Sequence, residues 1–148
     1  MNKLFLKWMV LSMLLVGASS ALAQSKHTLH QSFEIDSINQ VTVEFAGEYE
    51  VVYWEGNTVL TETQIELYDA NPNILSHFVK LGRYLVEGDK GTDLAFFKHK
   101  DLIRKPIYTK DGQAWEVVKM KFYVPDTFSS NDKKHFSMAG ELKTQVNK

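Results

Sequence analysis

Hydrophobic and polar residues alternate along residues 41–67, and this alternation is the clearest structural signal in the chain. Val41, Val43 and Phe45 are each separated by one polar residue. A period of two is typical of a β-strand with one buried face. The following Ala46-Gly47 interrupts the pattern and indicates a tight turn or a β-bulge.

The alternation resumes over Tyr49–Tyr53 and again over Val59–Leu67. A Glu-Gly-Asn turn at residues 55–57 separates the two runs, and its glycine supplies the positive φ that such turns often require. Val52 and Trp54 interrupt the polar face of the first run. We therefore expect this strand to be covered on both sides near its end.

A helical pattern begins at residue 71. Asn71 is a suitable N-cap, and Pro72 fits the first helical turn, where its missing N–H costs nothing. The next apolar residues follow helical spacing and form one stripe: Ile74, Leu75, Phe78, Val79 and Leu81. Gly82 then suits a helix C-terminus. The pattern predicts a short helix over Pro72–Leu81 that packs on the sheet.

Further strands are expected after this helix, at residues 83–87, 93–98, 107–109 and 114–124. The last of these is a second clean alternation, which Pro125 ends. Short connectors favour antiparallel pairing, and a single helix is too few for a parallel βαβ sheet. The sequence therefore predicts a mainly β fold: a compact antiparallel β-sandwich, or an open barrel-like sheet, with one short helix.

The first residues, Met1–Ala23, have the features of a secretory signal peptide. Lys3 and Lys7 precede an apolar run, and Ala21-Leu22-Ala23 matches the small-residue pattern that precedes cleavage. The apolar run is too short to span about 30 Å of hydrocarbon comfortably, which argues against a membrane anchor. We expect cleavage after Ala23 and an exported protein, either periplasmic or at the cell surface.

The mature chain is expected to contain one domain. We predict a flexible N-terminal lead over residues 24–32, a β-rich globular domain over residues 33–125, and a polar C-terminal tail over residues 126–148. The chain contains no cysteine, so its folding does not depend on disulfides, which fits a bacterial envelope protein.

Charge argues against nucleic acid as a partner. The whole chain carries 17 Lys and Arg against 18 Asp and Glu. Removal of Lys3 and Lys7 with the signal peptide leaves a net charge of −3. The chain as a whole has no basic excess to neutralise phosphates, so we do not expect nucleic acid as a partner.

The sequence shows no catalytic constellation. His27 and His30 lie near the predicted new amino terminus, but no carboxylate completes a metal site with them, and no histidine has zinc-site spacing. Glu48 and Glu50 share one strand face, which a solvated surface explains. No nucleophile elbow and no phosphate-binding glycine loop are present. We expect no cofactor, no metal and no enzymatic activity.

Aromatic residues give the one suggestion of a binding site. Flat rings exposed on a sheet can stack on sugars or on another protein, although most aromatic residues build cores. Trp54 is the strongest candidate because it interrupts a polar face. The candidate ligand-binding residues are Val52, Tyr53, Trp54 and Trp115.

The order of these elements resembles the front part of the head GIN domain of the bacterial auto-transporter adhesin family. The matching segments are Tyr49–Tyr53, the turn at residues 55–57, Asn73–Leu75, Gly82–Val86 and Lys121–Pro125. The resemblance implies an exported, adhesin-like domain and no catalytic residues. In that family Asn- and Gly-rich β-helical rungs follow. This chain ends soon after Pro125, so we expect a compact sandwich instead.

These observations favour a non-enzymatic exported domain of the cell envelope that binds an unknown envelope protein or a glycan. A periplasmic carrier of a small ligand is the alternative, and an apolar pocket with a few polar groups would distinguish it. A hydrolase is a third hypothesis. We expect no nucleic-acid partner and no membrane span after signal removal.

Overall fold

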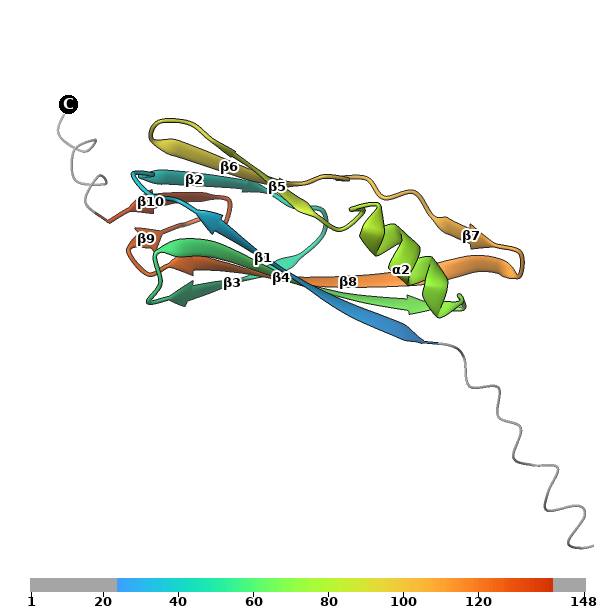
Figure 1. Cartoon of the computed structure of the whole chain (residues 1–148). Helices are drawn as coiled ribbons and strands as arrows, with labels where there is room; N and C mark the ends of the chain where they lie inside the picture. Colours follow the sequence, from blue (N-terminus) through green and yellow to red (C-terminus); the bar gives the residue numbers. More distant parts are fainter. Residues whose placement is uncertain (1–23, 140–148) are drawn as a thin grey trace, which may run out of the picture.

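The computed structural model describes residues 24–139, and these form two β-sheets and one helix (Figure 1). The predicted signal peptide, residues 1–23, lies outside the described residues. The elements, in chain order, are β1 (Ser25–Glu34), β2 (Gln40–Glu44), β3 (Tyr49–Trp54), β4 (Thr58–Tyr68), α2 (Pro72–Lys80), β5 (Val86–Lys90), β6 (Leu94–His99), β7 (Ile107–Thr109), β8 (Gly112–Pro125), β9 (Phe128–Ser129) and β10 (His135–Met138). No helix within residues 24–139 is long and apolar enough to cross a bilayer.

The first sheet has the order β1-β4-β8-β3, and β7 also pairs with β8. The 14-residue strand β8 is its central element, because its first residues pair with β7 and its last residues pair with β3. The second sheet has the order β5-β6-β2-β10-β9. The predicted mainly β, sandwich-like fold with one helix is confirmed, and the sheets do not close into a barrel.

Both sheets are mixed, whereas the sequence predicted antiparallel pairing throughout. Strand β2 pairs with β6 in parallel, and β3 pairs with β8 in parallel. The cause is that β2 and β3 lie in different sheets, although only four residues separate them in the chain. Each therefore pairs with a strand that arrives after a long connection, which is what a parallel pair requires.

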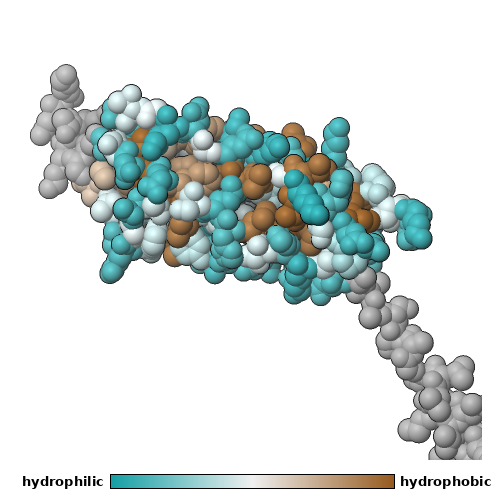
Figure 2. Space-filling view, viewed as in Figure 1, coloured by the Kyte–Doolittle hydropathy of each residue, from teal (hydrophilic) through white to brown (hydrophobic). Residues whose placement is uncertain are grey.

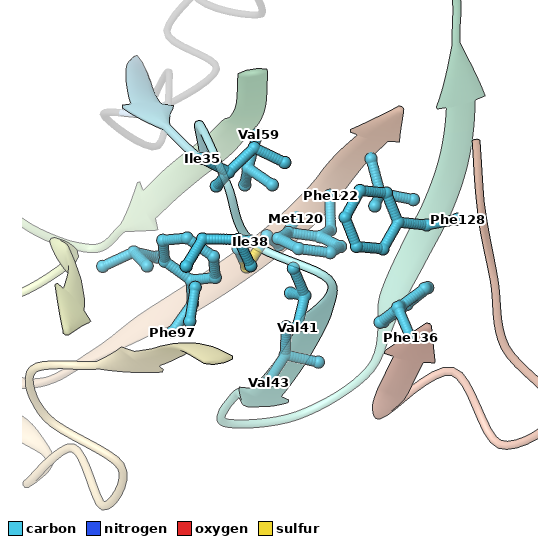
Figure 3. Packing of buried hydrophobic residues seen from close by; sticks show 13 residues of the cluster. Ile35, Ile38, Val41, Val43, Val59, Phe97, Met120, Phe122, Phe128 and Phe136 are labelled. Carbon is cyan, nitrogen blue, oxygen red and sulfur yellow. The ribbon is translucent and has the colours of Figure 1, made fainter. Parts of the chain in front are cut away.

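The main core lies between the two sheets, and Figure 3 shows side chains from both sheets pointing toward one another. Phe122 of β8 is fully buried at its centre. Its ring centroid lies 5.4 Å from that of Phe45, 6.2 Å from that of Phe97 and 5.6 Å from that of Phe136. Strand β8 thus pairs with β3 and faces β2 across the core, so these segments build one compact domain.

A second, smaller core lies beyond the sandwich, where α2 covers the same sheet. Leu75 of α2 and Tyr84 pack there against Ile65 and Leu67 of β4. We call this part of the molecule, residues 24–29, 63–85 and 100–119, the α2/β7 end, and the other described residues the sandwich end. Figure 1 shows that β1 begins at the α2/β7 end, whereas β9 and β10 lie at the opposite end.

The helix forms as predicted and ends one residue earlier than expected. The Asn71 side-chain oxygen accepts a hydrogen bond from the amide of Asn73 at 2.9 Å, and Pro72 occupies the first turn. Gly82 follows the helix with a φ of +75°, a conformation that favours glycine.

The predicted flexible lead over residues 24–32 is wrong, because these residues belong to the ten-residue strand β1. The side-chain amide of Gln31 holds β1 to β5: its nitrogen donates to the carbonyl of Val86 at 2.9 Å, and its oxygen accepts from the amide of Val86 at 2.8 Å. These two bonds are the same kind that the backbone of a neighbouring strand would make with Val86.

The predicted polar tail is wrong for residues 126–139, because β9 and β10 extend the second sheet there. Phe128 and Phe136 enter the main core from these strands. The rest of the predicted tail, residues 140–148, lies outside the described residues.

Candidate binding surface

Aromatic side chains from three neighbouring strands gather on the outer face of the first sheet, at the α2/β7 end. Trp115 of β8 lies directly opposite Tyr68 of β4. Tyr108 of β7 lies opposite Gln113, two residues before Trp115, so the two rings belong to diagonal neighbours. We call this surface the aromatic face; it consists of Tyr68, Tyr108, Trp115 and Val117.

The strand alternation explains why these side chains point away from the protein. Ala114 and Ile107 are buried against α2, and so is Leu67. Their chain neighbours must therefore point to the opposite side of the sheet. Trp115 is 62% exposed and Tyr108 is 73% exposed, which is unusually open for residues of this size.

Polar side chains border the aromatic face. The side-chain nitrogen of Gln24 donates to the Tyr68 hydroxyl at 2.8 Å and to the Glu66 carboxylate at 3.1 Å. Lys26 forms an ion pair with Glu66 at 3.0 Å. Hydrogen bonds from Tyr68 and Lys26 lower the pKa of Glu66, so this carboxylate stays ionised as a hydrogen-bond acceptor.

On the opposite side of the sheet from the aromatic face, Glu116 of β8 binds the loop that precedes β7. Its carboxylate lies 3.0 Å from Nε of Arg83 and 3.1 Å from Nε of Arg104, and it accepts a hydrogen bond from the Tyr84 hydroxyl at 2.7 Å. The side chains of Arg83, Arg104 and Glu116 are at most 16% exposed. This cluster fixes the 100–106 loop to β8.

The pKa values within this cluster follow from burial and charge. Burial opposes ionisation of Glu116, but hydrogen bonds from Arg83 and Tyr84 outweigh it, so the pKa of Glu116 lies below its ordinary value. Burial, followed by the hydrogen bond to Glu116, raises the pKa of Tyr84. The carboxylate is therefore charged and the phenol neutral at neutral pH.

The structure does not bring the four predicted binding residues together. Val52 and Trp54 lie on the outer face of β3, and Tyr53 points to the other side with 47% exposure. Trp54 lies opposite Pro125 on β8. Trp115 is ten residues earlier on that strand, a separation of about 33 Å.

Trp54 closes the turn at residues 55–57 and is not free for a partner. Its indole nitrogen donates to the carbonyl of Thr58 at 3.1 Å. The ring lies against Gly56, where an added Cβ would be 2.1 Å from the nearest ring atoms. Of the predicted residues, Trp115 is the one at the aromatic face. Tyr68 and Tyr108 were missed, although alternation with buried Leu67 and Ile107 was a signal that could have found them.

Two surface hollows are lined mainly by polar side chains. The first, about 630 Å³, lies beside the start of β3 and is lined by charged residues that include Glu48, Glu50, Lys119 and Lys121. The second, about 240 Å³, includes Asp132 and His135. A third hollow, about 330 Å³, lies over β1 and β4, where Leu60 and Tyr123 contribute apolar surface beside Gln31 and Glu62. None of the three is an enclosed apolar cavity of the kind that a carrier of a small ligand needs.

Asp132 and His135 form the arrangement closest to a catalytic pair. Nδ1 of His135 lies 2.6 Å from the Asp132 carboxylate, and both side chains are more than half exposed. Asp132 also accepts hydrogen bonds from the amides of Lys134 and His135 at 2.8 Å, and from the hydroxyl of Ser130. The bond to His135 and the two amide bonds lower the pKa of Asp132. This pattern is that of a turn stabilised by an aspartate.

His27 and His30 do not share a site. They are three residues apart on β1, so their side chains point to opposite faces of the strand. His30 lies 3.6 Å from Glu62 on the outer face. Among the described residues, no three His, Cys, Asp or Glu side chains are grouped to hold a metal ion.

His99 is the one buried histidine among the described residues, with 1% exposure. Its Nδ1 accepts a hydrogen bond from the amide of Ala46 at 2.8 Å, and its Nε2 is buried without a partner. The ring packs on Phe45. Burial, followed by the charge of Arg104, lowers the pKa of His99 from 6.5 to about 4.

Acid is therefore expected to weaken the fold through His99. Above pH 6.5 the residue is neutral in both states. As the pH falls from 6.5 to about 4, the unfolded chain binds a proton that the folded chain excludes, which costs about 3 kcal/mol in total. The His99→Asn variant keeps an acceptor for the amide of Ala46 and should lose this part of the pH dependence.

Urea unfolding of the wild-type protein and of this variant, measured near neutral pH and near pH 4, tests the expectation. His77→Asn is the matched control, because His77 is exposed. Equal acid sensitivity of the wild-type protein and the His99→Asn variant would show that His99 is not responsible.

Comparisons with protein-family models, curated proteins and solved structures found no match for this chain.

Proposed function

We propose that this chain is a non-enzymatic, exported domain of the cell envelope that binds a partner through its aromatic face, in the manner of an adhesin. The observation that carries the proposal is the set of rings that β4, β7 and β8 present on one open surface. Exposed Trp and Tyr side chains provide large contact areas with little entropy loss, and they dominate many binding sites. The hydrogen-bonding groups of Gln24 and Glu66 border the rings.

A flat surface is more suitable for an extended partner than for an enclosed small molecule. The rings lie on a sheet face, and the smaller core beneath it is filled by side chains such as Leu67, Leu75 and Ile107. The carrier hypothesis requires an enclosed apolar pocket, whereas the described hollows lie at the surface and each has charged side chains in its lining. These observations favour binding of a surface or a polymer.

Binding of the predicted mature chain, residues 24–148, to a glycan array and to isolated envelope fractions tests this function. This chain contains every described helix and strand. Replacing both Trp115 and Tyr108 with alanine should weaken binding about tenfold or more, because the main contact area is lost.

Tyr53→Ala is the matched control, since Tyr53 is exposed but lies outside the aromatic face. The proposal is wrong if the wild-type chain binds neither set, or if Tyr53→Ala weakens binding as much as the double variant.

A further inference from the structure

The exposed apolar residues are concentrated at one end of the molecule. Eight large hydrophobic side chains of the described residues are exposed. Two of them, Tyr53 and Leu94, lie at the sandwich end. The six at the α2/β7 end are Leu81, Leu102, Ile103, Tyr108, Trp115 and Val117. Figure 2 shows apolar side chains at the surface of this end, among polar ones.

Charge is divided between the same two ends. The α2/β7 end carries eight Lys and Arg against five Asp and Glu, a net charge of +3. The sandwich end carries five Lys and Arg against twelve Asp and Glu, a net charge of −7. The described part of the chain is acidic as a whole, so its field orients the basic end toward an anionic surface.

Exposed apolar and basic residues occur together in the loop before β7 and in the turn after it. Ile103 is 91% exposed, and the next residue, Arg104, is fixed to Glu116 of β8. Lys105 and Lys110 are exposed on either side of β7. The loop before β7 and the turn after it thus place an aliphatic side chain and two lysines at the same end of the molecule as the rings of Trp115 and Tyr108.

We propose that the α2/β7 end docks on the surface of an anionic phospholipid bilayer, without spanning it. This inference rests on the proposed binding function and names the partner. Trp and Tyr favour the headgroup region, aliphatic residues enter the acyl boundary, and lysines attract anionic headgroups. An uncharged glycan would explain the rings but not the division of charge, and binding to an acidic protein instead of the bilayer is an outcome that the test below distinguishes.

Flotation of residues 24–148 with lipid vesicles tests the inference. Omitting residues 1–23 prevents their apolar run from causing binding by itself. We expect binding to an equal mixture of phosphatidylcholine and phosphatidylglycerol, and binding about tenfold or more weaker to phosphatidylcholine alone. Added salt should weaken binding to the mixture.

Variants show whether vesicle binding depends on the α2/β7 end or on the rest of the protein. Trp115→Ala, and the double change Lys105→Glu with Lys110→Glu, should each weaken vesicle binding about tenfold. Leu94→Ala should leave it unchanged, since Leu94 is exposed at the sandwich end. In a Trp54→Phe background, the fluorescence of Trp115 should shift to shorter wavelength with the vesicles and be quenched by brominated lipids.

Unquenched Trp115 fluorescence, or equal vesicle binding by Leu94→Ala and Trp115→Ala, would overturn the inference. If the chain fails to bind vesicles but binds a glycan or an envelope protein through Trp115, the membrane inference is wrong and the proposed binding function stands. If Trp115 contributes to no binding in either experiment, both are wrong.

Discussion

Replacing Glu116 with alanine is expected to lower the free energy of unfolding by about 3–5 kcal/mol. The carboxylate balances Arg83 and Arg104, and the two side chains are only 11% and 16% exposed. Its removal leaves two guanidinium groups without their anion, and the Tyr84 hydroxyl without its acceptor. A buried charge without a partner costs more than the ion pair itself contributes.

Chemical denaturation at neutral pH measures this loss. Glu87→Ala is a suitable control, because Glu87 is an exposed strand residue, and it should change stability by less than about 0.5 kcal/mol. Glu116→Gln tests the charge separately, since it keeps the shape and removes the anion. A Glu116→Ala variant within about 1 kcal/mol of the wild-type protein would contradict the structural role of this cluster.

Replacing Phe122 with alanine is expected to destabilise the domain by about 3–5 kcal/mol. Phe122 is fully buried and contacts rings from β6, from β10 and from the β2–β3 connection. A cavity at this position removes the contact between the two sheets. The protein loses buried apolar area and dispersion contacts. Much of the cavity remains, because the surrounding β-structure relaxes only partially.

Tyr123→Ala provides the comparison, since Tyr123 is the next residue on β8 and lies on the outer face. It should cost clearly less than Phe122→Ala. Phe122→Leu should fall between the wild-type protein and Phe122→Ala, because it leaves a smaller cavity. If Tyr123→Ala proves as costly as Phe122→Ala, the assignment of the two faces of β8 is wrong.

The elements that could be predicted are those whose pattern depends on a single buried face. In β8 the even residues from Val118 to Val124 are the inner ones, as their alternation predicted. The helix was predicted from its cap, its proline and its apolar stripe. In both cases, neighbouring residues in the chain decide the structure.

The missed elements depend on distant contacts. The apolar side chains of β1 are few, and β1 is held by β4 and by the amide of Gln31. The pairings of β2 with β6 and of β3 with β8 follow from a crossover between sheets. Alternation shows which face is buried, but it does not show which strand is the neighbour.

The candidate site could be predicted only in part. Trp115 could be selected from the sequence because it is a large residue in an alternating strand. The position of Tyr108 beside it depends on the pairing of β7 with β8, which no local pattern reveals. Trp54 was a reasonable choice from the pattern, but its indole group caps a turn.

The resemblance to the head GIN domain stays a prediction, as do export and the adhesin-like function. The mainly β fold, the exposed aromatic face and the filled core support the proposal of a binding domain. The geometric support is that three strands present rings outward, while on the other side of the sheet the partly buried carboxylate of Glu116 holds the adjoining loop in place.

Site-specific photo-crosslinking in cells that make the full chain is the most direct test of the central claim. A photoreactive residue at position 115 or 108 should form covalent adducts with an envelope component, whether protein, glycan or lipid. The same residue at position 94 or 53, which is exposed elsewhere on the molecule, should give few. Absence of adducts at position 115, or equal labelling at all four positions, would contradict a binding function at the aromatic face.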